Sequence, residues 1–107
     1  MIKNNRYLVL ELAQHAINAV RGDRLVARAA SDAHFEPPLY VVAIGKAAAA
    51  MAAGVQRVLD KQIRRTLIIT KRGHISPWSK ALRQAEIIQA GHPIPTRESL
   101  AAGERLL

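Results

Sequence analysis

Three short turns in the sequence combine glycine with basic or histidine side chains, which is a combination suited to holding an anion. Each turn directly follows a short apolar run. The candidate residues of these turns are Gly45, Lys46, Lys71, Gly73, His74, Gly91 and His92. A glycine turn that opens a helix presents backbone N–H groups and the positive helix end, and both favour phosphate or carboxylate groups. The pattern therefore predicts a site for a small anionic substrate.

Lys46 is the first candidate for a catalytic role, because it follows an apolar run and Gly45 and precedes an alanine-rich segment. The Gly-Lys pair does not belong to a P-loop, since the G-x-x-x-x-G-K-[ST] spacing is absent. Residues 45–54 also lack the G-x-G-x-x-G fingerprint of dinucleotide-binding domains. A lysine in this position is often only a solvated residue, so its assignment depends on the other two turns.

His74 and His92 could in principle form a pair of metal ligands. The sequence has no cysteine, and its other two histidines are His15 and His34. No cluster of carboxylates lies near either candidate in the sequence, so a complete ligand set is lacking. We therefore expect both histidines to line or cap their turns, and we predict no metal site.

The elements that must position these turns alternate between apolar runs and helical patterns. Strands are predicted over residues 39–44, 66–70 and 85–89, and helices over 6–20, 24–31, 46–60 and 97–107. The spacing of the first two strands allows a right-handed helical crossover, and hence parallel pairing. The predicted fold is α/β, a parallel sheet with flanking helices in a Rossmann-like three-layer arrangement. All three turns would then lie at the carboxyl edge of the sheet, where such folds bind ligands.

The first predicted strand, LYVVAI at residues 39–44, is apolar throughout, so we expect it to be covered on both faces. The first helix carries apolar residues at helical spacing, including Leu8, Leu12 and Ile17, and is expected to be amphipathic.

Composition limits the function classes. The 107 residues favour one domain, and the formal net charge of +8 invites a nucleic-acid interpretation. The basic residues are spread over three regions, however, and no aromatic residue alternates with them as a base-stacking surface requires. Nucleic-acid binding is therefore not the favoured reading, although a non-catalytic basic module that binds anions or nucleic acid remains an alternative. The first sixteen residues are too polar for a signal peptide or a membrane span, so we expect a cytoplasmic protein without a membrane partner.

Taken together and in order, the three motifs resemble the N-terminal domain of the glycerate 2-kinase family. They read VVAIGKAAAAMAAGVQRVL, LIITKRGH and AEIIQAGHPIPTRESLAAGERLL. Members of this family pair this domain with a C-terminal MOFRL domain and are often labelled hydroxypyruvate reductase. Arg72, Gln89 and Thr96 depart mildly from the family pattern. The serine- and glycine-rich loop that comes next in the family and the MOFRL domain have no counterpart in the 107 residues.

The resemblance implies a kinase that transfers the γ-phosphoryl group of ATP to D-glycerate, giving 2-phosphoglycerate, with Mg²⁺ as cofactor. Lys46 would be the catalytic residue, neutralising the substrate carboxylate or the transferring phosphoryl group. The substrate-binding residues would be Gly45, Lys71, Gly73, His74, Gly91 and His92. The resemblance also leaves open an NAD(P)H-dependent hydroxypyruvate reductase, although no nicotinamide fingerprint is present.

The departure in length predicts that residues 1–107 are an incomplete N-terminal part of a larger domain. We expect this part to be inactive alone, since the ligands for magnesium and most contacts to ATP would lie in the absent portion. Association with that C-terminal portion, or a homodimer, is expected.

Overall fold

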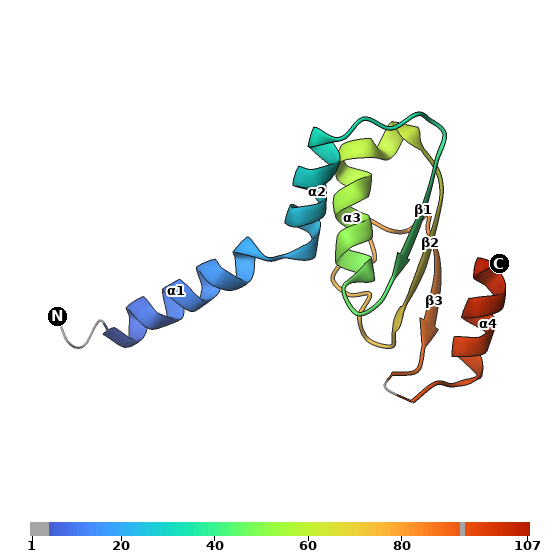
Figure 1. Cartoon of the computed structure of the whole chain (residues 1–107). Helices are drawn as coiled ribbons and strands as arrows, with labels where there is room; N and C mark the ends of the chain where they lie inside the picture. The colour runs from blue at the N-terminus through green and yellow to red at the C-terminus, as the bar shows by residue number, and fades with distance from the viewer. Residues whose placement is uncertain (1–4, 93) are drawn as a thin grey trace.

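The computed structural model describes residues 5–92 and 94–107 and contains a parallel sheet with helices on both sides (Figure 1). The elements in chain order are α1 (Asn5–Ala19), α2 (Gly22–Asp32), β1 (Leu39–Ile44), α3 (Ala48–Leu59), the 3-10 turn η2 (Asp60–Gln62), β2 (Ile63–Lys71), β3 (Glu86–Ala90) and α4 (Arg97–Leu106). The predicted elements are confirmed in type and order. The largest change is at β2, which begins three residues before the predicted strand because Ile63 already pairs with Leu39.

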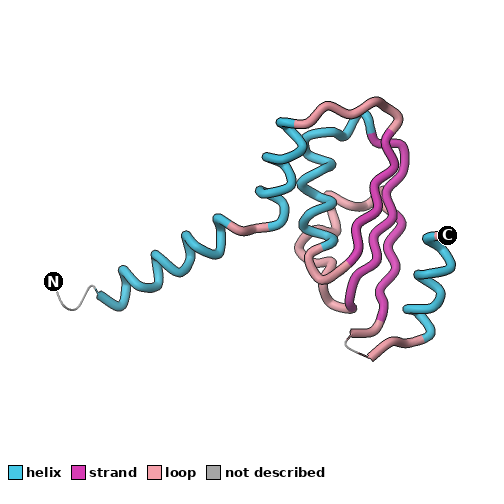
Figure 2. Tube along the Cα trace, viewed as in Figure 1, coloured by secondary structure: helices cyan, strands magenta, loops and turns pink. Residues whose placement is uncertain are grey.

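The three strands are parallel and are arranged in the order β1-β2-β3 (Figure 2). Ile44 at the end of β1 pairs with Ile69, and Lys71 at the end of β2 pairs with Ala90. The carboxyl ends of the strands therefore meet at one edge of the sheet. This edge lies at the bottom of Figure 1, where the strand arrows end.

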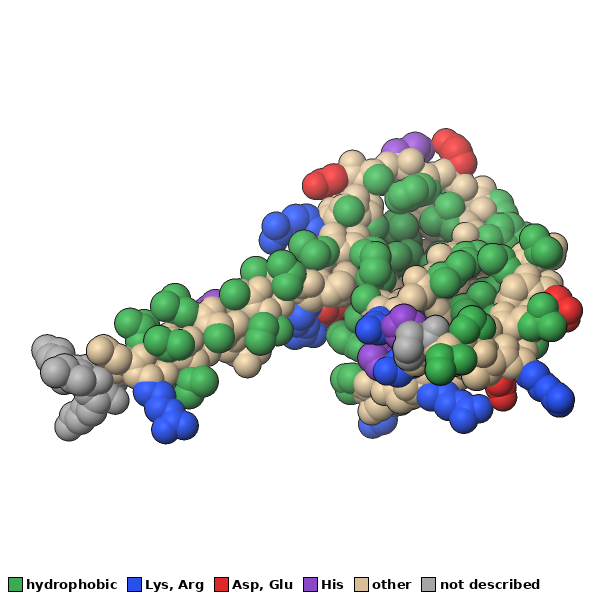
Figure 3. All heavy atoms as spheres, turned by 60° about the horizontal axis from the view of Figure 1, so that its bottom comes forward, with side chains coloured by type: hydrophobic (Ala, Val, Ile, Leu, Met, Phe, Trp, Pro, Cys, Tyr) green, Lys and Arg blue, Asp and Glu red, His purple; other side chains and the backbone are tan. Residues whose placement is uncertain are grey.

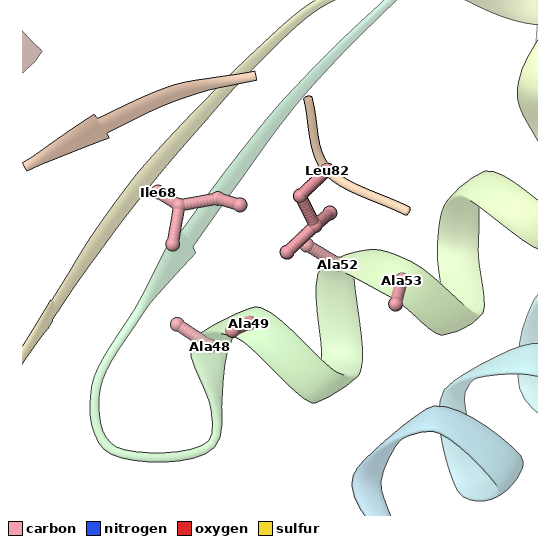
Figure 4. Packing of buried hydrophobic residues seen from close by; sticks show 6 residues of the cluster. All are labelled: Ala48, Ala49, Ala52, Ala53, Ile68 and Leu82. Carbon is pink, nitrogen blue, oxygen red and sulfur yellow. The ribbon is translucent and has the colours of Figure 1, made fainter. Parts of the chain in front are cut away.

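The core lies between α3 and one face of the sheet. Four alanines of α3 pack with two larger residues, and the cluster is Ala48, Ala49, Ala52, Ala53, Ile68 and Leu82 (Figure 4). Small side chains let the helix approach the sheet closely, and alanine also has the highest helix propensity. Leu82 is fully buried although it lies in the segment between β2 and β3, for which the sequence predicted no helix or strand.

The opposite face of the sheet is covered unevenly. α4 packs on β3, whereas alternate residues of β1 stay exposed: Tyr40, Val42 and Ile44. The prediction that β1 would be covered on both faces was therefore wrong for the described residues. The ten residues of α4 lie over β3, and a groove of about 200 Å³ separates its last residues, Arg105 and Leu106, from β1.

α1 extends away from the rest of the molecule, and none of its residues is buried (Figure 1). The predicted helix is confirmed, but its apolar side chains, among them Leu8, Leu12 and Ile17, remain exposed. In the described part of the chain, no helix combines the length and the apolar character needed to cross a membrane.

Candidate functional site

A cavity of about 210 Å³ opens at the carboxyl edge of the sheet and receives residues from all three strand ends. Its lining consists of Ile44, Gly45, Lys46, Ile69, Thr70, Lys71, Ala90, Gly91 and His92. The cavity thus brings together Lys46 and four of the predicted substrate-binding residues, which come from three separate segments of the chain. In Figure 3, where this edge is turned toward the viewer, basic and histidine side chains lie next to one another.

Gly45 shapes the first turn. Its φ of 122° lies in a region that L side chains rarely adopt, so the abrupt exit from β1 requires glycine at this position. The Gly45 N–H donates to the Ile69 carbonyl (3.0 Å), which continues the pairing of β1 with β2 by one residue. The Gly45 carbonyl accepts from the Ala48 N–H (3.2 Å) and from the Thr70 hydroxyl (2.7 Å). The backbone at this corner is therefore held from both sides.

Lys46 lies in the turn before α3, which begins at Ala48 rather than at the predicted position 46. Its side chain is exposed at the mouth of the cavity, and Lys71 is half-buried at the end of β2. The Lys46 N–H has no hydrogen-bond partner among residues 5–92 and 94–107. Two lysines and a free N–H beside a helix start make this cavity attractive to a carboxylate or a phosphate.

The same lining does not fit Mg²⁺. Magnesium prefers oxygen ligands, usually carboxylates, and none of the residues that line the cavity is acidic. Within the described ranges, no three histidine, cysteine, aspartate or glutamate residues are grouped so that they could hold a metal ion. The cavity is therefore suited to the anionic group of a substrate and not to a cation.

The second turn is placed differently from the other two, because Gly73 and His74 do not line the cavity. The Gly73 N–H donates to the Gln89 side-chain oxygen (3.2 Å), and the Arg72 guanidinium pairs with Glu98 of α4 (3.2 Å). These contacts connect the turn to β3 and to α4. In this structure the second turn therefore links the end of β2 to β3 and α4.

The third turn is closed by α4. The Gly91 N–H donates to the Thr96 hydroxyl (3.2 Å), and a Cβ atom at position 91 would lie only 2.6 Å from the Ile94 carbonyl oxygen. Thr96 is the N-cap of α4, and its N–H donates to the Ser99 hydroxyl (3.0 Å). Any side chain at position 91 would collide with atoms of its own loop, so this position requires glycine.

The carboxylate of Glu98 in the first turn of α4 is stabilised in its charged form. Its own backbone N–H, the Thr96 hydroxyl and the Arg72 guanidinium hold the pKa of Glu98 below its usual range. The position of Glu98 also suits the positive end of the helix, because it lies in the first turn of α4.

Sequence reasoning missed Thr70, which lines the cavity and is almost completely buried. Its hydroxyl is the group that reaches the Gly45 carbonyl. A signal was available, because Thr70 is a polar residue at the end of an otherwise apolar run, LIIT, directly before Lys71. Buried hydroxyl groups nearly always have a hydrogen-bond partner, so this position pointed to a specific contact.

Comparison with known proteins places these features in a wider group. Residues 8–107 match the family model described as "Domain of unknown function (DUF4147)". The chain is 34% identical over 100 residues to a protein of Thermotoga maritima named D-glycerate 2-kinase, covering 94% of this chain and 23% of that protein. It is 31% identical over 93 residues to a glycerate 2-kinase of Pyrococcus horikoshii, covering 85% of this chain and 20% of that protein.

A third relative, from Agrobacterium vitis, carries the provisional name hydroxypyruvate reductase and is 36% identical over 66 residues, covering 62% of this chain and 14% of that protein. Among solved structures, a glycerate kinase from Thermotoga maritima is similar with a TM-score of 0.84 at 32% identity, covering 97% of this chain and 24% of that one. The chain thus spans about a quarter or less of the length of these two kinase relatives.

Proposed function

The chain belongs to the DUF4147 family, and on this membership and the kinase relatives we propose that it is the N-terminal part of a kinase that phosphorylates D-glycerate. The γ-phosphoryl group of ATP passes to the 2-hydroxyl oxygen of D-glycerate. The bond from phosphorus to the β,γ-bridging oxygen breaks, a bond to the hydroxyl oxygen forms, and the hydroxyl proton is released. The products are ADP and 2-phosphoglycerate. Both substrates are metabolites of the cytoplasm, which is where we propose that the protein acts.

The observation that carries this proposal is the single cavity shared by Lys46, Lys71 and His92. Phosphoryl transfer depends on positioning and charge stabilisation more than on covalent chemistry by the protein. Lys46, in the turn directly before α3, is suited to neutralising the glycerate carboxylate or the transferring phosphoryl group. Lys71 and His92 are suited to contacting the same substrate from the ends of β2 and β3.

We propose further that this cavity is one side of a larger cleft. The chain corresponds to about a quarter of the Thermotoga maritima kinase, and the residues that line the cavity include none that fits magnesium. Residues outside positions 1–107 of such a kinase would supply the metal ligands and most contacts to ATP. The 107 residues are then expected to bind an anion without turning over substrate.

A chimeric enzyme tests this function. The matching N-terminal segment of the Thermotoga maritima kinase is replaced by this chain, and ADP release is measured with D-glycerate and ATP. We expect turnover by the chimera and none by the 107 residues alone. A folded chimera without turnover would contradict the proposed role of this segment, and turnover by the isolated chain would contradict the divided site.

The provisional name of the Agrobacterium vitis relative supports hydroxypyruvate reduction as a second candidate. This reaction requires a nicotinamide site, and the turn after β1 lacks the glycine fingerprint of one. Oxidation of NADH or NADPH in the presence of hydroxypyruvate, measured on the same chimera, separates the two functions. We expect no such oxidation above the rate without hydroxypyruvate.

A further inference from the structure

Thr70 places a hydroxyl group in a buried position, where such a group is kept only if it stabilises the fold or serves the function of the site. It is the next-to-last residue of β2, only 3% of it is exposed, and it lines the cavity beside Lys46. Burying a hydroxyl costs free energy unless it is hydrogen-bonded, and here the group donates to the Gly45 carbonyl over 2.7 Å. Residue 70 and residue 45 are thus joined across two neighbouring strand ends.

This bond controls the direction of one peptide group. The Gly45–Lys46 peptide is trans, so its carbonyl oxygen and its N–H point in opposite directions. Because the carbonyl is held against Thr70 and the Ala48 N–H, the Lys46 N–H is directed away from Thr70. Glycine at φ 122° offers little conformational resistance of its own to rotation of this peptide, so the direction depends on the bonds that the carbonyl makes.

We propose that Thr70 is a positioning residue of the anion site, which acts by fixing the Gly45 carbonyl so that the Lys46 N–H and side chain are presented together to a substrate carboxylate or phosphoryl oxygen. This inference rests on the proposed function of the cavity. Preorganised donors are effective because they need no rearrangement when the anion arrives. Loss of the Thr70 hydroxyl therefore weakens anion binding through Lys46, without removing any group that touches the anion.

A purely structural role predicts a different outcome. If the hydrogen bond of the hydroxyl contributes only to the stability of the fold, its loss lowers stability and leaves the anion affinity of the folded protein unchanged. Thr66 provides a matched control, because it lies four residues earlier on the same strand and the same face. Its hydroxyl makes no hydrogen bond within the described residues, and it does not line the cavity.

The experiment follows backbone amide signals of the isotope-labelled 107-residue chain by NMR during titration with inorganic phosphate and, separately, with D-glycerate. In the wild-type chain we expect saturable shifts at Lys46 and Ala47. Thr70→Val is expected to weaken the apparent affinity about tenfold. Thr70→Ser, which keeps the hydroxyl, and the control Thr66→Val are expected to stay within about twofold of wild type.

Wild-type affinity in folded Thr70→Val would overturn the positioning role while leaving the anion site intact. Absence of shifts in the wild-type chain with both anions would overturn the anion site and this inference together. If Thr70→Val does not fold, Thr70→Ala provides the same comparison with a smaller side chain at a lower temperature. Shifts with phosphate but not with D-glycerate would mean that the site does not bind the carboxylate of the substrate. The phosphoryl group would then be the group that Lys46 contacts.

Discussion

The same dipeptide, Gly-His, occurs after two neighbouring strands, yet the two copies have different surroundings. Gly91 and His92 line the cavity, whereas Gly73 and His74 do not. The register of the sheet explains the difference. Lys71 pairs with Ala90, so Gly91 is the first residue beyond that level and Gly73 is the second. The second pair thus lies one residue further along the chain than the first, outside the cavity, and its Gly73 N–H bonds to Gln89 of β3.

The two turns show that the role of a Gly-His pair depends on how many residues separate it from the last paired residue of its strand. In the second turn, Lys71 is the residue that reaches the cavity, and the following residues connect elements. In the third turn, the Gly-His pair itself reaches it. The site should therefore be sensitive to Lys46, Lys71 and His92 and insensitive to His74, and substitutions can test this division.

The largest effect is expected for Lys46→Ala. In the chimeric kinase, loss of this cation at the site of developing charge should lower kcat by about 10²–10³-fold. The Lys46 side chain is exposed, so the thermal unfolding midpoint of the 107-residue chain should change little. Lys61→Ala is the matched control, because it removes the same charge from η2 at the other end of the strands. Equal rates for the two variants would remove Lys46 from the mechanism.

A smaller effect is expected for Lys71→Met, which keeps the aliphatic stem of this half-buried side chain and removes its charge. The phosphate affinity of the 107-residue chain should fall about tenfold, because one of two nearby positive charges is lost. NMR titration provides the measurement. Lys80→Met, in the segment between β2 and β3, is the control and should keep wild-type affinity. Unchanged affinity in Lys71→Met would place the second turn entirely outside the site.

Much of this arrangement could be predicted from the sequence, for physical reasons. Apolar runs separated by a helix-length segment predict parallel strands, and parallel strands bring their carboxyl ends to one edge. Periodicity does not determine register, however, so the different levels of the two Gly-His pairs could not be predicted. The cover of a strand face also depends on which helices reach it, and for that reason the exposed face of β1 was missed.

The ion pair between α4 and β3 should affect stability and not binding. The Arg105 Nε–H donates to the Glu86 carboxylate at 2.6 Å, and this hydrogen bond is the main reason why the pKa of Glu86 lies below its usual range. A carboxylate with a lowered pKa stabilises the fold above its unfolded-state pKa, and this contribution is lost as the pH falls through the lowered value. Arg105→Ala should therefore lower the thermal unfolding midpoint at neutral pH by about 1–4 °C and have a progressively smaller effect at acidic pH.

Arg83→Ala serves as the control for this pair, since Arg83 is exposed and forms no ion pair within residues 5–92 and 94–107. Its thermal midpoint should match wild type at both pH values. A loss of stability in Arg105→Ala that persists at acidic pH would mean that packing of the side chain, and not its ion pair with Glu86, holds α4 on β3.

The smallest effects belong to the two histidines, and they test the comparison most directly. His92→Ala should weaken phosphate binding by about threefold, because it removes one polar contact at an exposed position of the cavity. His74→Ala should leave the affinity unchanged, since the described cavity does not include it. The two variants have the same substitution after the same glycine, so composition and net charge change equally. A loss of affinity in His74→Ala equal to that in His92→Ala would mean that the level of the strand end does not decide which Gly-His pair meets the substrate.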